Sequence, residues 1–117
     1  MGRVRSGMLV WFGLTMAVQA EPTKIVGIGA ASCARFGADA AAQPAMERDY
    51  FAWAQGFMSG ALIRAPDGVD EGLDLAPPSL PLAAQADFLR TFCAANPATD
   101  YSDAVRALYH RLRGPAS

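Results

Sequence analysis

The stretch 44-PAMERDYFAWAQGFMSGALIR-64 predicts the fold, because it has the pattern of one long amphipathic helix. Its apolar residues recur every three or four positions, which places them on a single face. They are Tyr50, Trp53, Ala54, Phe57, Met58, Ala61 and Leu62. Glu47 and Asp49 lie in the early turns, where the helix dipole favours negative charge. Arg64 lies in the last turn and Pro66 follows, so we expect a helix from residue 44 or 45 to residue 64.

Two further helices are expected on the C-terminal side. Residues 82–95 have an apolar stripe at helical spacing, and Asn96-Pro97 ends this helix. The stripe consists of Leu82, Ala86, Leu89 and Cys93, widened by Phe88 and Phe92. A last helix begins after Asp100, which can cap it. Its buried face consists of Val105, Leu108, Tyr109 and Leu112. Residues 67–81 are too rich in glycine and proline for regular structure and predict a connector.

The N-terminal half of the chain has weaker signals. Residues 24–29 are β-prone, which favours either one extended segment or one small strand. Residues 33–36 predict a single helical turn, and the alanine-rich residues 37–44 carry no clear pattern. The chain as a whole therefore predicts a mainly α fold: a small single-domain helical bundle of three principal helices, with one disulfide and at most one short strand.

Residues 1–20 have the layout of a cleavable signal peptide. Arg3 and Arg5 precede an apolar run from Met8 to Val18, and Val18-Gln19-Ala20 offers residues that a signal peptidase accepts. The run is shorter than the roughly 20 residues with which a helix spans a bilayer. We expect cleavage near Glu21, no stable membrane anchor after cleavage, and a periplasmic or secreted protein. Residues 21–117 would then form a single helical domain with a core from about residue 33 to 112.

The charge of the remaining chain argues against nucleic acid as a partner. The predicted leader contains two of the ten basic residues and none of the eleven acidic ones, which leaves a net charge of −3. Nucleic-acid binding requires clustered lysine and arginine. Lys24 is the only lysine, and the arginines are scattered.

The two cysteines, Cys33 and Cys93, predict one disulfide, because an even pair in a small exported domain is typical of oxidising compartments. The alternative is a catalytic thiol accompanied by a second free thiol. A closed loop of this length would stabilise the fold by roughly 4 kcal/mol on chain-entropy grounds.

Two glycine pairs resemble functional motifs. Gly27-Ile-Gly29 has the first two glycines of a dinucleotide-binding loop, but the chain is too short for the fold that this loop requires, so a turn is expected. Gly56 and Gly60 flank Ser59 at the wrong spacing for a nucleophile elbow. They lie four residues apart on one helix face and predict the close approach of another backbone.

No set of residues predicts catalysis, a cofactor or a metal site. His110 is the only histidine, and a metal site or a catalytic triad needs more partners than the sequence places around it. The acidic residues Asp67, Asp70, Glu71 and Asp74 make calcium conceivable, but their spacing does not match the calcium-loop register, so a solvated turn is expected.

The same acidic loop is a candidate binding surface. Asp70 and Glu71 are therefore candidate partner contacts, and so is Phe51, which lies off the main apolar stripe of its helix.

Four segments of the chain resemble small secreted proteobacterial proteins. They are Cys33, then Trp53-Ala-Gln-Gly56-Phe57-Met-Ser59-Gly60, then Phe92-Cys93-Ala-Ala-Asn96-Pro97, then Ala104 with Leu108. The cysteine followed by Asn96-Pro97 and a final helix resembles periplasmic acid-stress chaperones of the HdeA/HdeB type, which are small, helical and held by one disulfide. The helix around Trp53, Gly56 and Gly60 resembles immunity proteins of the Tai/Rap type, which neutralise secreted amidase toxins in the periplasm.

Two functions follow as expectations. The first is a non-enzymatic periplasmic binding protein, an inhibitor or accessory factor that covers a protein partner with its helical surface. The second is an acid-activated chaperone, whose carboxylates are neutralised below about pH 3, so that repulsion among the basic groups opens the fold to unfolded client proteins. A homodimer is compatible with either function.

Overall fold

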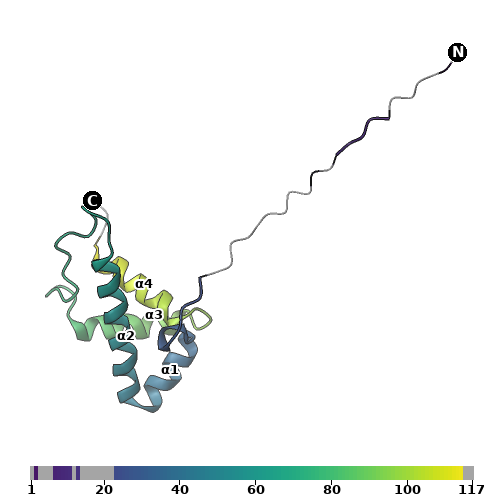
Figure 1. The fold of residues 1–117 in the computed structure, drawn as a ribbon. Helices are drawn as coiled ribbons and strands as arrows, with labels where there is room; N and C mark the ends of the chain where they lie inside the picture. Colours follow the sequence, from purple (N-terminus) through teal and green to yellow (C-terminus); the bar gives the residue numbers. More distant parts are fainter. Residues whose placement is uncertain (1, 3–6, 12, 14–22, 115–117) are drawn as a thin grey trace.

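A computed structural model describes residues 2, 7–11, 13 and 23–114. This part of the chain contains one 3₁₀ helix and four α-helices, and no β-strand (Figure 1). They are η1 (Ile28–Ala30), α1 (Cys33–Ala42), α2 (Pro44–Ile63), α3 (Leu82–Ala95) and α4 (Tyr101–Leu112). The predicted mainly α bundle with one disulfide is confirmed. Arg3, Arg5 and the predicted cleavage site, Val18-Gln19-Ala20, lie outside the described residues.

The three predicted helices are found at the expected positions. Helix α2 begins with Pro44 in its first turn and ends at Ile63, and α3 ends just before Asn96. At the start of α4, the Asp103 carboxylate accepts a hydrogen bond from the Asp100 backbone N–H (3.1 Å). No helix in the described part of the chain is both long and apolar enough to cross a membrane.

Helix α1 is longer than the single turn predicted for residues 33–36. It continues through the alanine-rich segment to Ala42, because alanine has the highest intrinsic helix propensity. The Ser32 hydroxyl caps it by accepting a hydrogen bond from the Arg35 backbone N–H (3.0 Å), and an Arg35–Asp39 ion pair (3.0 Å) spans one turn. Propensity and capping therefore favour a helix through the alanine-rich segment, for which the sequence predicted no clear pattern.

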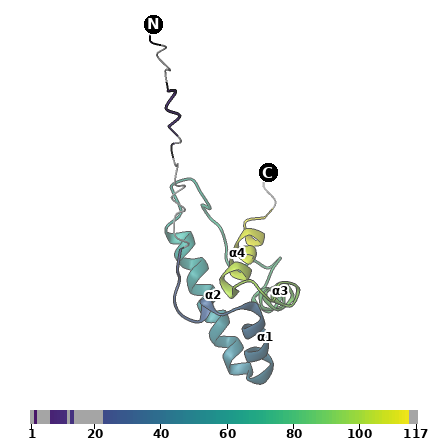
Figure 2. The same cartoon turned by 90° about the vertical axis from the view of Figure 1, so that its right-hand side faces the viewer.

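The prediction for Gly56 and Gly60 is wrong. Among the described residues, a Cβ atom built at either position would have no neighbour within 4 Å, so no second backbone in this part of the chain lies against them. The close approach occurs instead at Gly29, where a Cβ would overlap the indole of Trp53. Residues 24–29 form no strand: Gly27 adopts φ 89° before the short helix η1, and η1 packs against α2. Figure 2 shows this N-terminal segment running beside α2.

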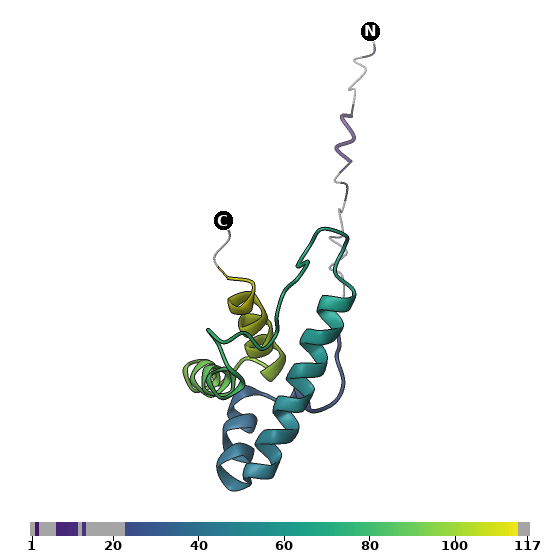
Figure 3. The same ribbon diagram turned by 90° about the vertical axis from the view of Figure 1, so that its left-hand side faces the viewer.

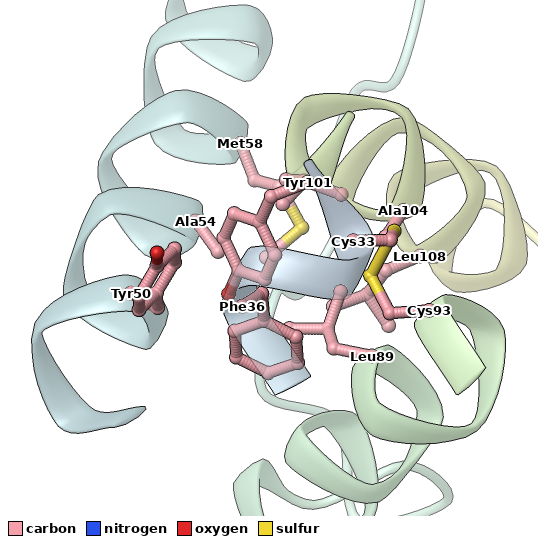
Figure 4. Close-up of a cluster of buried hydrophobic side chains, with 11 residues drawn as sticks. Cys33, Phe36, Tyr50, Ala54, Met58, Leu89, Cys93, Tyr101, Ala104 and Leu108 are labelled. Atoms are coloured by element: carbon pink, nitrogen blue, oxygen red, sulfur yellow. A yellow bond between two sulfur atoms is a disulfide. The ribbon is translucent and has the colours of Figure 1, made fainter. Parts of the chain in front are cut away.

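The core lies where α1, α2, α3 and α4 meet (Figure 4). Three aromatic rings form its centre: Phe36, Tyr50 and Tyr101, whose centroids are separated by 4.7–5.0 Å. Small and aliphatic side chains surround them, all nearly inaccessible to solvent. These are Ala54, Met58, Leu89, Ala104, Val105 and Leu108. Leu82, predicted to belong to the buried stripe of α3, is 43% exposed, and Gln85 is buried in its place.

The predicted disulfide between Cys33 and Cys93 is confirmed. It joins the first residue of α1 to the last turn of α3 across 60 residues of sequence, with 4.7 Å between the Cα atoms. Both cysteines are buried, at 1% and 3% exposure. The bond therefore lies inside the core, where it is typical of a structural disulfide in an oxidising compartment.

The turn between α3 and α4 completes the start of α1. Two of the backbone N–H groups that a helix leaves unpaired at its N-terminus find carbonyl acceptors there. Cys33 donates to the Thr99 carbonyl (2.7 Å) and Ala34 donates to the Pro97 carbonyl (3.0 Å). The Asn96 side chain donates to the Phe92 carbonyl (2.9 Å), which holds the turn in shape. Asn96-Pro97 thus ends one helix and caps another.

Residues 64–81 connect α2 to α3 without regular structure, as predicted. The buried Gln85 amide donates to the carbonyls of Leu75 (2.8 Å) and Leu80 (3.0 Å) and so holds the second half of the connector. Figure 3 shows the connector leaving the top of α2 and returning to α3, which is seen nearly end on. Helix α1 lies below α3 in this view, beside the lower half of α2.

Candidate protein-binding groove

The candidate site is the space between the first half of α2 and helix α3. In the described structure α1 packs on both helices, whereas α2 and α3 do not approach each other closely at the backbone. A side-chain ion pair between Glu47 of α2 and Arg90 of α3 crosses the space. Surface depressions lie on both sides of this pair.

The larger depression has a volume of about 570 Å³ and lies between α2 and the start of α3. Its apolar lining comes from both helices: Pro44, Phe51, Leu82, Ala83 and Ala86. Arg48, Gln55 and Asp87 add polar groups to this lining. Ligand sites in proteins have volumes of roughly 300–1,000 Å³ and are mainly apolar with a few polar groups, and this depression fits that description.

The smaller depression has a volume of about 350 Å³ and lies between α1 and the end of α3. The disulfide cysteines are part of its lining, together with Phe36 and Pro97. Small residues contribute most of the remainder: Ala34, Gly37, Ala40, Ala41 and Ala94. Glu47 and Arg90 line both depressions, so the two depressions adjoin at the ion pair.

Arg90 holds the centre of the groove through its guanidinium group. One nitrogen donates to Glu47 across the groove and another donates to Asp87 on the same helix. The hydrogen bond to Asp87, followed by the one to Glu47, raises the pKa of Arg90 above its usual value. Arg48 is exposed and takes part in none of the ion pairs or side-chain hydrogen bonds formed among the described residues. Within the described part of the chain it is therefore an unpaired cation at the α2 edge.

Phe51, a predicted partner contact, lines the larger depression. It is half-buried and packs against the edge of the core, so part of its ring remains accessible beside Leu82 and Ala86. The prediction that it contacts a partner stays a prediction, but its position is consistent with that role.

Asp70 and Glu71, the other predicted partner contacts, lie away from the groove. Glu71 is exposed, whereas the Asp70 carboxylate is turned toward α4. It accepts hydrogen bonds from the Tyr109 hydroxyl (2.7 Å) and from Nε of Arg113 (2.7 Å). Burial and the hydrogen bond to Asp70 raise the pKa of Tyr109. Asp70 adopts φ 58°, so the connector backbone turns sharply at the residue that ties it to α4.

The remaining motif residues have structural contacts. Trp53 stacks on Phe57 with 5.2 Å between the ring centroids and covers Gly29. His110 is exposed and lines an open depression with Phe88 and Arg111. Within the described residues, no group of three histidine, cysteine, aspartate or glutamate side chains could hold a metal ion.

Sequence reasoning missed the groove itself, because it depends on the distance between α2 and α3. It also missed Gln85, because a polar residue inside an apolar stripe gives no sign of where its amide will bond. The Glu47–Arg90 pair joins residues 43 positions apart and has no local signal either.

Comparisons with known protein families, with curated proteins and with solved structures find no match. The groove is therefore interpreted from its own geometry and chemistry.

Proposed function

We propose that the protein is a non-enzymatic periplasmic binding protein, an inhibitor or accessory factor that binds a protein partner through its helical surface. The groove between α2 and α3 is the observation that supports this function most. It combines apolar lining, a half-accessible aromatic ring and a charged edge, which is the composition of protein–protein contact regions.

Two observations support the periplasmic location. The buried Cys33–Cys93 disulfide is typical of proteins in an oxidising compartment. In addition, Met8, Leu9 and Trp11 in the predicted leader are 83–92% exposed, so these apolar side chains have no place in the core. An apolar segment outside the core is what a removable leader requires.

Photo-crosslinking of a partner from a defined position in the groove tests this function. The protein carries a photo-crosslinker at Phe51 in the periplasm of its producing cell, and the control carries the same group at Ala52, which is exposed and lines none of the described depressions. A single partner crosslinked at neutral pH from position 51, and not from position 52, would support the proposal. Crosslinking that appears only after acidification would contradict it.

A second candidate function, an acid-activated chaperone, is favoured by a different observation. Three hydrogen bonds between side chains of different elements have a carboxylate as their acceptor; each is called a tie below. Asp39 of α1 accepts from Tyr50 of α2 (2.8 Å), Glu47 accepts from Arg90 of α3, and Asp70 of the connector accepts from α4. Protonation of these carboxylates weakens each tie at low pH, while the disulfide remains intact.

The test is the aggregation of an acid-sensitive client enzyme at pH 2–3. Protection at equimolar protein, with no protection at pH 7, would support the chaperone function. Aggregation that is unchanged by the protein at pH 2–3 would exclude it.

A further inference from the structure

We propose that the two depressions form one continuous groove and that its occupant is an amphipathic α-helix of a partner protein, about four turns long, with an acidic residue opposite Arg48. This inference rests on the proposed binding function and names the binding surface and the chemistry of the partner.

The continuity of the groove follows from helix α3. Residues three or four positions apart lie on one side of a helix, and the α3 residues that line the two depressions follow this spacing. These residues are Leu82, Ala83, Ala86, Asp87, Arg90, Cys93 and Ala94. Helix α3 has 14 residues, so this wall is about 21 Å long, the length of four helical turns. Opposite it, α1 and the first half of α2, which are joined at Gln43, form the second wall.

The walls favour a helix over an extended peptide. An extended segment gains its affinity from main-chain hydrogen bonds to an open sheet edge, and the described part of the chain has no β-sheet. A helix bonds its own backbone internally and needs only an apolar face to enter a groove. The alanines of α3 and of α1 are small, so the partner helix can come close, and its apolar side chains can fill the space on both sides of the Glu47–Arg90 pair.

The charges at the groove are the reason for expecting an acidic residue on the partner helix. Glu47 and Asp87 are both paired with Arg90, whereas Arg48 is exposed and has no partner among the described residues. A carboxylate on the partner helix would pair with Arg48 at the edge of the groove. Such an edge pair speeds association and selects partners more than it adds affinity.

A displayed library of 16-residue helical peptides, randomised on one face and selected against the purified full-length protein, tests the inference. The expected peptides carry apolar residues at i, i+3 or i+4, and i+7, with Asp or Glu beside this stripe. Alanine-to-arginine changes then block each half of the groove separately: Ala83→Arg in the larger depression and Ala94→Arg in the smaller one. Both residues are exposed, as is Ala52, whose change Ala52→Arg is the matched control.

Each blocking change should weaken the binding of a selected peptide at least tenfold, while Ala52→Arg should leave it unchanged. Far-UV circular dichroism and the melting temperature check that every variant is folded. Arg48→Glu should also weaken binding, and a peptide with lysine in place of its acidic residue should restore it. Peptides without helical periodicity, or binding that responds to only one blocking change, would overturn the continuous groove. If a partner captured in the periplasm binds equally well to both blocked variants, the continuous groove would also be overturned, yet the proposed binding function would stand.

Discussion

Trp53 and Gly29 show how one missing side chain shapes the protein. Trp53 is a large half-buried ring in the middle of α2, and it is accommodated because Gly29 has no Cβ atom at the point of contact. The glycines of α2 have no such role. The cost of about 1 kcal/mol that each imposes on the helix relative to alanine is therefore not offset by packing at those positions.

Gly29→Ala should therefore destabilise the protein by about 1–3 kcal/mol, because the new methyl group displaces the indole. Gly56→Ala and Gly60→Ala, the matched controls, should each stabilise it by up to about 1 kcal/mol. Urea unfolding followed by tryptophan fluorescence measures all three variants. A loss of stability in Gly56→Ala would show that a neighbour lies against that face after all.

The Tyr50–Asp39 hydrogen bond predicts a specific response to acid. This bond lowers the pKa of Asp39, whereas burial and the bond raise the pKa of Tyr50 to about 12. A carboxylate with a lower pKa in the folded state stabilises the fold above its unfolded value of about 3.9, and this contribution is lost as the pH falls through the folded value.

Tyr50→Phe keeps the ring and removes the donor. It should reduce stability by about 1 kcal/mol at pH 7, and the difference from the unmodified protein should shrink at pH 2–3. Urea unfolding at both pH values measures this change. An equal difference at the two pH values would mean that the tie does not depend on ionised Asp39.

At the scale of elements, the connector forms turns of its own, and side chains tie these turns to the helices. The Gln85 amide binds the second half of the connector through two backbone carbonyls. In the first half, the Asp70 carboxylate accepts hydrogen bonds from Tyr109 and Arg113. Two backbone carbonyls in the connector thus depend on a single buried side chain.

Gln85→Leu should leave those two carbonyls without their donor and cost about 1–3 kcal/mol. The connector should also become the first site of cleavage in limited proteolysis. Gln55→Leu, which removes a half-buried glutamine that forms no hydrogen bond through its side chain in the described structure, is the control. Equal cleavage rates in the two variants would contradict the role of Gln85.

The sequence predicted the helices whose large apolar residues recur every three or four positions and whose ends are marked by proline, asparagine or a capping residue. Residues 44–64, 82–95 and 101–112 combine both, and their observed bounds agree closely with prediction. Helix α1 was underestimated, because its stability comes from alanine propensity and from contacts with residues 97–99, which periodicity does not report. The groove and its central ion pair depend on how helices pack, so no local pattern predicted them. Of the predicted contact residues, only Phe51 lies in the groove.

For the molecule as a whole, the disulfide is the strongest single constraint. Replacing both cysteines by alanine should lower the free energy of unfolding by roughly 4 kcal/mol, a large part of the 5–15 kcal/mol of a typical domain. Urea unfolding of the double variant, and of the oxidised protein with and without reductant, measures this loss. A thiol assay should find no reactive cysteine before reduction. Two reactive thiols in the native protein would contradict the bond.

The capping of α1 by the turn at residues 97–99 also bears on the order of folding. The first turn of α1 emerges early in synthesis, but its carbonyl acceptors follow more than 60 residues later. Contacts between such distant segments form late and slow the folding of a chain. The first turn of α1 therefore lacks these two acceptors until residues 97–99 have been made.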